Sequence, residues 1–197
     1  MKNKKTALLL VLGAILLVAA TMFGTVAYLT STDTVENTFT VGNVAITLDE
    51  TDVDVYGVKD SENRVKENVY KLIPGHTYVK DPTIHVAANS EAAWLFVKVE
   101  DEIAAIQDAT TIAAQLTANG WVALEGVDGV YTRATAVATS ANVQDFKVFD
   151  YFKVKTNLVY NDIKDLAGKT IVVTAYAVQA DGFATAKAAW TAANFGA

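Results

Sequence analysis

The chain has 197 residues, no cysteine and a net charge of −6, and 52% of its residues are hydrophobic. One domain with a hydrophobic core fits this length, and the absence of cysteine excludes disulfides, thiolate metal sites and a cysteine nucleophile. Residues 1–27 contain three lysines and no acidic residue, so the rest of the chain carries a net charge of about −9. A surface this acidic repels phosphate backbones and anionic lipids, so we expect no nucleic-acid partner.

The first 27 residues have the pattern of a secretory signal peptide. Three lysines form a basic tip, residues 7–20 are almost entirely aliphatic, and the small residues Thr-Val-Ala end the segment. Cleavage is expected between Ala27 and Tyr28, which predicts an extracellular protein that meets the membrane only through the uncleaved segment. The alternative is a retained anchor, because residues 6–32 carry no charge and are long enough to span a bilayer.

Residues 30–38 have few apolar side chains and no structure breaker, so we expect an N-terminal extension over residues 28–38 and a single domain over residues 39–197. Most of that domain is predicted to be strands, because apolar side chains alternate with polar ones at the period of a half-buried sheet. The expected strands cover residues 39–41, 44–48, 49–60, 69–73, 78–80, 83–87, 93–100, 121–124, 130–133, 146–155 and 170–179.

Local features refine this pattern. Pro74-Gly75 predicts a type II turn, since proline presets the first central position and glycine tolerates the second. Pro82 indicates an edge position for the strand that follows it. Residues 61–68 are predicted to form a charged surface loop, whereas residues 93–100 are apolar on both faces and predict a central strand covered on both sides.

Helical spacing of apolar residues predicts one helix, or two short ones, over residues 101–119, with Asp101 as the cap and Asn119-Gly120 as the end. A single helical turn is expected within residues 161–169, and an alanine-rich helix over residues 183–194. Strands outnumber helices and no βαβ alternation occurs. We therefore predict a mainly β fold, a two-sheet antiparallel jelly-roll-like sandwich with two or three short helices on its connections.

Sequence motifs of enzymes are absent, so we expect neither an enzyme nor a cofactor. The chain has no His-Glu-x-x-His pair, no Gly-x-Ser-x-Gly elbow and no glycine-rich phosphate loop. Its two histidines, His76 and His85, flank Asp81 and could bind a metal together, but the spacing indicates no third ligand. We interpret both as surface or strand-edge side chains and expect no metal site.

Two further groups of side chains have alternative interpretations. Asp52 and Asp54 could bind calcium, yet the Asp-x-Asp-x-Asp-Gly loop and its closing Glu are absent, which favours a solvated acidic strand. Four aromatic residues could stack on a ligand, although a role in the core is the favoured interpretation: Trp94, Trp121, Tyr176 and Trp190.

Several stretches share one resemblance. After the signal-peptide pattern come residues 28–30 (Tyr-Leu-Thr) and 37–44 (Asn-Thr-Phe-Thr-Val-Gly-Asn-Val). Residues 72–82 contain a Pro-Gly pair followed by a charged residue and a second proline, and residues 95–99 and 175–183 extend the similarity. Together these stretches resemble the TasA/camelysin (CalY) family, secreted Gram-positive proteins that are processed by the dedicated signal peptidase SipW.

The resemblance implies an extracellular jelly-roll subunit of a fibre in the biofilm matrix. In such fibres the segment after the cleavage site leaves its own domain and completes the sheet of the next subunit, which gives a head-to-tail homopolymer. The donor region here would comprise Tyr28, Leu29, Val35, Phe39 and Val41, with Leu29 and Val35 inserted and Phe39 and Val41 at the start of the body. A signal peptidase of the SipW type is the other implied partner.

Two other functions are compatible with the sequence. A non-polymerising surface or adhesive binding module would present exposed aromatic side chains and would not need residues 28–38. Camelysin-like members of the family are also described as metallopeptidases. For this chain that activity would rest on His76 and His85, which no catalytic motif accompanies.

Overall fold

The computed structural model describes residues 43–109 and 112–195. The signal peptide, the bond between Ala27 and Tyr28, and the donor residues Leu29, Val35, Phe39 and Val41 lie outside the described residues, so these expectations and the domain boundaries remain predictions. Within the described ranges, no helix is long and apolar enough to cross a membrane.

The described residues form ten strands, three α-helices and two short 3-10 helices. The strands are β1 (Ile46–Val53), β2 (Lys59–Val65), β3 (Thr77–Val79), β4 (Thr83–Val86), β5 (Ala93–Asp101), β6 (Trp121–Ala123), β7 (Val130–Arg133), β8 (Gln144–Lys147), β9 (Tyr151–Lys153) and β10 (Ile171–Gln179). The helices are η1 (Ala104–Ile106), α2 (Ile112–Ala118), α3 (Tyr160–Ile163), η2 (Lys164–Leu166) and α4 (Ala186–Ala193).

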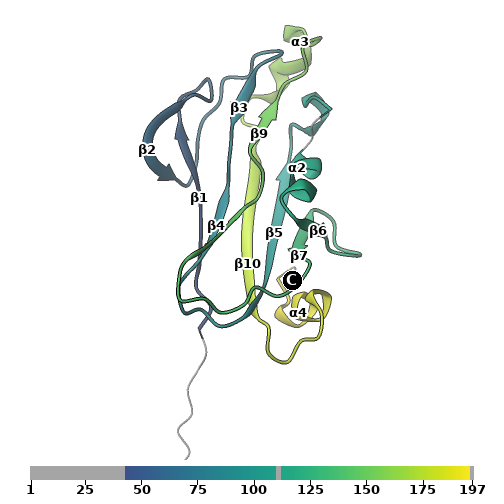
Figure 1. The fold of residues 1–197 in the computed structure, drawn as a ribbon. Coiled ribbons are helices and arrows are strands. Elements are labelled where there is room, and N and C mark those ends of the chain that lie inside the picture. Colours follow the sequence, from purple (N-terminus) through teal and green to yellow (C-terminus); the bar gives the residue numbers. More distant parts are fainter. Residues whose placement is uncertain (1–42, 110–111, 196–197) are drawn as a thin grey trace, which may run out of the picture. The chain divides into compact units, whose positions relative to one another are not determined.

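These strands make two four-stranded antiparallel sheets and one two-stranded sheet (Figure 1). The first sheet has the order β2-β1-β4-β8 and the second sheet the order β10-β5-β7-β6, while β3 pairs with β9. In the longest ladder, β10 pairs with β5 from Ile171 opposite Asp101 to Gln179 opposite Ala93. The expected fold class, a mainly β antiparallel sandwich with short helices, is confirmed.

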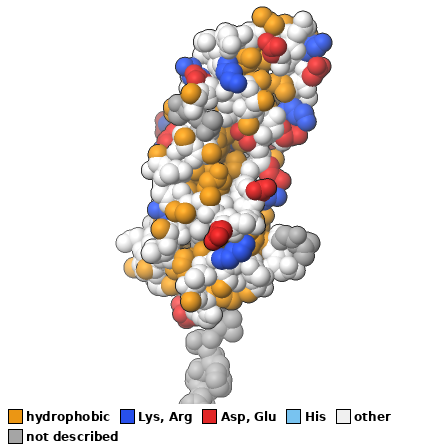
Figure 2. Space-filling model, turned by 90° about the vertical axis from the view of Figure 1, so that its right-hand side faces the viewer, with side chains coloured by type: hydrophobic (Ala, Val, Ile, Leu, Met, Phe, Trp, Pro, Cys, Tyr) orange, Lys and Arg blue, Asp and Glu red, His pale blue; other side chains and the backbone are white. Residues whose placement is uncertain are grey.

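Charged side chains of both signs are mixed on the surface that Figure 2 shows. Lys and Arg side chains lie among Asp and Glu side chains there, and hydrophobic side chains occupy much of the area between them. On this face of the described residues no basic patch forms, which agrees with the acidic balance of the sequence.

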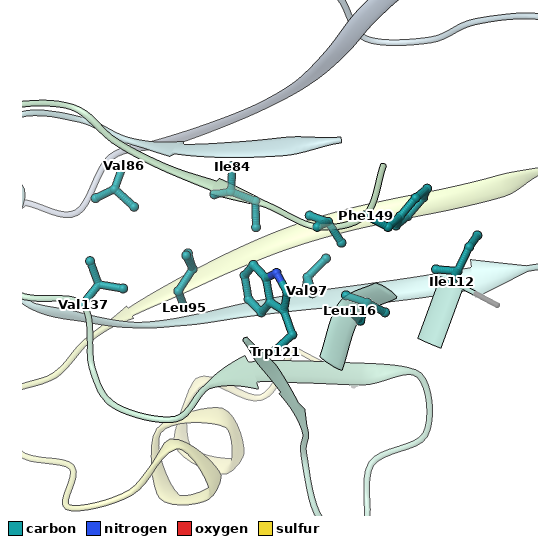
Figure 3. Packing of buried hydrophobic residues seen from close by; sticks show 10 residues of the cluster. Ile84, Val86, Leu95, Val97, Ile112, Leu116, Trp121, Val137 and Phe149 are labelled. Carbon is teal, nitrogen blue, oxygen red and sulfur yellow. The ribbon is translucent and has the colours of Figure 1, made fainter. Parts of the chain in front are cut away.

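The main hydrophobic core lies between the two four-stranded sheets (Figure 3). Ile84 and Val86 of β4 point toward Leu95 and Val97 of β5, and the ring of Trp121 lies beside them. These residues are two apart on their strands because alternate side chains share one face of a sheet. The buried members of this core are Ile84, Val86, Leu95, Val97, Ile112, Leu116, Trp121, Val137, Val148 and Phe149.

Helix α4 covers part of the outer face of the second sheet. Its Trp190 packs against Phe96 of β5 and Tyr176 of β10, with ring centroids 5.1 and 5.3 Å apart. The helix begins after its N-cap Thr185, whose hydroxyl oxygen accepts the N–H of Ala188 at 3.2 Å. The aromatic side chains on this face therefore pack against the protein itself.

Two predictions for residues 61–73 are wrong. The charged stretch expected as a loop forms β2, whose Val65 and Arg64 pair with Glu50 and Thr51 of β1. A strand at the edge of a sheet accepts such charges because one side of it faces solvent. Residues 69–73, expected as a strand, have no strand structure, and the N–H of Ile73 donates to the Tyr78 hydroxyl at 2.8 Å instead.

Two further predictions are wrong in the region of the core. The strand after Pro82 is central, because β4 lies between β1 and β8; Pro82 precedes its first residue and its carbonyl accepts the N–H of Val148 at 2.8 Å. Residues 146–155 do not form one strand but contribute β8 and β9 to different sheets. Val148 and Phe149 lie between β8 and β9 and belong to neither strand. Both are 0% exposed, because their side chains fill the core.

The strand expected over residues 49–60 is interrupted, because β1 ends at Val53 and a turn leads to β2 at Lys59. Several other local predictions are confirmed. The Pro74-Gly75 turn is present, with Gly75 at φ +77° and the N–H of His76 donating to the Ile73 carbonyl at 3.1 Å. Strand β5 is central, β6 and β7 form a hairpin, and residues 101–119 contain two short helices, η1 and α2. The predicted cap at Asp101 is wrong: Asp101 ends β5 and accepts the N–H of Ile103 at 3.0 Å, whereas Ile103 is the N-cap of η1 and no side chain caps that helix.

Candidate functional site: an open groove between β1 and β10

One side of the sandwich is open and forms a groove of about 950 Å³. Strand β1 of the first sheet and strand β10 of the second sheet form its two walls. The segment after β2 and the segment that contains α3 and η2 border it. The apolar residues that line it include Ile46, Leu48, Val69, Leu72, Ile163, Leu166, Ile171, Val173 and Ala175.

The wall formed by β10 has an unpaired backbone edge. Among the described strands β10 pairs only with β5, over its whole length. The carbonyl of Thr170 and the N–H of Ala180 both bond toward the β5 side, to Glu102 and Ala92. Because hydrogen-bonding direction alternates along an antiparallel strand, the even-numbered residues face β5 and the odd-numbered ones face the open edge. Val173, Ala175 and Ala177 therefore direct their N–H and C=O groups away from the sheet.

The opposite wall, β1, is unpaired over its first half. Residues Ile46–Asp49 pair with β4 on one side, but pairing with β2 on the other side begins only at Glu50. The Lys66 ammonium donates to the carbonyl of Leu48 at this uncovered edge. Two strand edges without a strand partner in the described residues thus border the same groove.

The apolar side chains of both walls belong to the main core but are incompletely covered. Six of them pack against the buried core while remaining only partly buried: Ile46, Leu48, Ile171, Val173, Ala175 and Ala177. Exposed apolar surface next to unpaired strand edges costs free energy in water.

A polar cluster lies in the wall of the groove around Glu50. Its carboxylate accepts a hydrogen bond from the Lys80 ammonium at 2.7 Å and another from the Asn68 amide at 3.0 Å. Glu50 and Lys80 are buried, at 4% and 9% exposure. Burial, and then the negative charges of Glu50 and Asp81, raise the pKa of the Tyr70 phenol above its ordinary value. Tyr70 remains protonated and donates to the carbonyl of Val79 at 3.0 Å.

The two histidines have different surroundings. His76 Nε2 lies 2.7 Å from the Tyr56 carbonyl oxygen, whereas the His85 ring lies between Asp145 and Asp49 at 2.7 and 3.0 Å. Burial by itself lowers the pKa of His85, but the hydrogen bonds and charges of these two carboxylates outweigh burial and raise it. Among the described residues, no group of three His, Asp or Glu side chains is arranged to hold a metal ion.

The acidic pair considered for calcium stabilises local structure. Asp52 accepts the Ser61 hydroxyl at 2.8 Å across β1 and β2. Asp54 accepts the N–H groups of Tyr56 and Val58, each at 2.9 Å, and so closes the turn between these strands. These contacts favour the structural interpretation of both carboxylates.

The sequence did not reveal the groove. The apolar content of residues 170–179 predicts a strand, but nothing in it indicates that one edge of that strand is unpaired. The Glu50 cluster was also not predicted, because its members come from three segments of the chain. No protein-family model matches the chain, and neither the curated proteins nor the solved structures contain a match to it.

Proposed function

We propose that this protein is a structural subunit of an extracellular fibre, in which each copy donates residues 28–38 to the groove of the next. The observation that carries this proposal is that the unpaired edge of β10 and the half-buried core side chains occur together along one side of the sandwich. A groove of this kind accepts an added strand, which supplies backbone hydrogen bonds and apolar side chains together.

The dimensions of donor and groove agree. Strand β10 has nine residues and therefore spans about 30 Å. Residues 28–38 comprise eleven residues and would reach about 36 Å when extended. Leu29 and Val35 are six residues apart, so both would point to the same face of an extended strand and toward the core.

The sequence supports directional assembly after export. Residues 28–38 follow the expected cleavage site directly, so removal of residues 1–27 by a SipW-type signal peptidase would free the donor end. A strand given to the next copy makes a head-to-tail contact that does not close on itself, which produces a filament. The acidic surface would oppose non-specific clumping.

The test compares two versions of the chain, one beginning at Tyr28 and one beginning at Phe39. We expect filaments from the first and monomers from the second, seen by electron microscopy and sedimentation velocity. A synthetic peptide of residues 28–38 should bind the shorter chain, whereas a peptide with the same residues in scrambled order should not. Filaments of equal length from both chains would rule out donation of this segment.

A second function, a non-polymerising binding module on the cell surface, draws on the same groove. An unpaired strand edge accepts an extended segment from any chain with suitable side chains. In that case the chain beginning at Tyr28 would remain monomeric at all concentrations, and its groove would bind a segment of a different protein.

A further inference from the structure

A primary amine, a carboxylate and a carboxamide meet in the polar cluster of the groove wall. The two oxygens of one carboxylate, that of Glu50, contact the Lys80 Nζ at 2.7 Å and the Asn68 Nδ2 at 3.0 Å. These three residues come from β1, from the segment after β2 and from the position after β3. The Lys80 amine, a nucleophile, and the Asn68 carboxamide, an acyl group, therefore both contact the Glu50 carboxylate, which can transfer protons.

The surroundings favour reaction between them. The Asn68 Oδ1 accepts the N–H of Val53 at 3.0 Å, which polarises the amide carbonyl and would stabilise negative charge on that oxygen. The ring of Tyr70 lies 5.9 Å from the Lys80 Nζ. Glu50 and Lys80 are buried, at 4% and 9% exposure, so little water competes for the contact between them.

The Asn68 amide also has a structural role, because it donates to the Thr51 carbonyl of β1 at 2.8 Å, but this role does not involve the ion pair of Glu50 and Lys80. A buried ion pair is weak in net stabilisation, because desolvation of both charges opposes their attraction. The chain also has no disulfide to fix its fold, since it contains no cysteine. A covalent link between neighbouring segments would supply what the ion pair by itself does not.

We propose that Lys80 and Asn68 form an intramolecular isopeptide bond, with Glu50 as the proton-transfer group. Glu50 takes a proton from the Lys80 ammonium, and the neutral Nζ attacks the Cγ of Asn68. Glu50 then passes this proton to the Asn68 Nδ2, the Cγ–Nδ2 bond breaks and ammonia leaves, and Glu50 takes the second proton from Nζ, so that the amide is neutral and Glu50 ends protonated. The products are one secondary amide and one ammonia molecule, so the step needs no oxidant, water or other reactant.

The bond joins the segment after β2 to the segment between β3 and β4; both segments contact Thr51 of β1, whose carbonyl accepts the Asn68 amide at 2.8 Å and whose N–H donates to Asp81 at 2.7 Å. It closes a loop from Asn68 to Lys80 and so restricts the unfolded chain, as a disulfide between the same segments would. The assignment is independent of the proposed fibre, because it concerns residues within one copy.

Mass spectrometry of the wild-type chain, without any substitution, tests the proposal. The intact mass should fall below the sequence mass by one ammonia molecule. Trypsin should release residues 67–71 joined to residues 72–98, with Lys80 resisting cleavage. An intact mass equal to the sequence mass would overturn the proposal. So would a loss of ammonia with the two peptides separate, since that result indicates cyclisation of Asn68 with its own backbone.

Variants test the roles of Lys80 as the nucleophile and of Glu50 as the proton-transfer group. Lys80→Arg keeps a cation beside Glu50 but removes the nucleophile, and Glu50→Gln keeps a hydrogen-bonding group but removes the proton-transfer group; both should have the full sequence mass. Lys66→Arg is the matched control, because Lys66 also borders the groove and contacts the Leu48 carbonyl, yet should retain the linked peptides. Circular dichroism would establish that each variant is folded.

Discussion

The two sides of the sandwich differ in how the core is covered. On the side of β6 and β8 the chain closes its own core: the Trp121 Nε1 donates to the Lys147 carbonyl at 2.8 Å, and the Gln115 amide donates to the Tyr151 carbonyl at 2.8 Å. Val148 and Phe149 lie beneath these contacts with 0% exposure. On the side of β1 and β10, core side chains remain half-buried along unpaired strand edges.

This difference separates folding from assembly. Helix α2 and residues 147–151 complete the closed side within one copy, so that side stabilises the monomer. On the open side β10 has one strand partner among the described strands, and under the proposed function the segment given by the next copy supplies the other. Substitutions on the closed side should therefore change the free energy of unfolding, and substitutions on the open edge should change self-assembly.

The largest expected effect is the loss of filament formation caused by Ala175→Pro on the open side. Proline removes an N–H that faces the open edge and bonds to no described residue, so the monomer should fold while filament formation is lost. Electron microscopy and circular dichroism together measure both properties. The control is Thr174→Pro, which removes an N–H bonded to β5 and should destabilise the monomer itself by about 3 kcal/mol or more. Normal filaments from Ala175→Pro would disprove pairing at this edge.

On the closed side, Phe149→Ala should lower the free energy of unfolding of the chain beginning at Phe39 by about 3–5 kcal/mol, because it leaves a cavity in the core. Urea denaturation followed by tryptophan fluorescence measures this change. Val122→Ala serves as the control, since Val122 is 50% exposed and should shift stability by about 0.5 kcal/mol or less. A loss below about 1 kcal/mol for Phe149→Ala would contradict closure of this side.

The same substitution at a fully buried and at a half-buried position gives a smaller, matched contrast. Val97→Ala removes a side chain with 0% exposure and should cost about 2 kcal/mol in the monomer. Val173→Ala, in the neighbouring strand, should cost about 1 kcal/mol or less because its side chain is half-buried. In the assembled protein the cost of Val173→Ala should rise toward that of Val97→Ala. Equal costs in monomer and fibre would mean that nothing covers Val173.

The smallest effect concerns His85, which lies on the opposite face of β4 from the core residue Ile84. The pKa of His85 is raised in the folded chain, so its contribution to stability is fully present below the unfolded value of about 6.5 and disappears as pH rises through the folded pKa. His85→Gln should therefore destabilise the monomer by about 1 kcal/mol or less near pH 5.5, and by less at pH 8. Denaturation curves at both pH values test the sign. A larger cost at pH 8 than at pH 5.5 would refute it.

Local sequence patterns predicted the type of each strand or helix better than they predicted which strands pair with each other. The type of β5, β10 and α4 followed from alternation and helical spacing, because these signals lie within one segment. Strand β2 was missed since its charges, which indicated a loop, suit an edge strand whose pairing with β1 is a tertiary property. The break between β8 and β9 also depends on the core, which takes up Val148 and Phe149.

The groove and the Glu50 cluster could not be predicted for a related reason. Strand β10 pairs with β5 over sequence separations of 70 residues (Ile171 with Asp101) to 86 residues (Gln179 with Ala93), and no local pattern tells which edge of a strand will be paired. Glu50, Asn68 and Lys80 occur in separate segments with no motif spacing. Their contact follows only from the packing of the segments beside β1.

The central claim is that the odd-numbered edge of β10 is free in the monomer and paired in the fibre. Residue-resolved hydrogen exchange measures it in the chain beginning at Phe39 and in filaments of the chain beginning at Tyr28. The amides of Val173, Ala175 and Ala177 should exchange rapidly in the monomer and slowly in the filament, while those of Thr174 and Tyr176 should be protected in both. Rapid exchange of the odd-numbered amides within intact filaments would contradict the account.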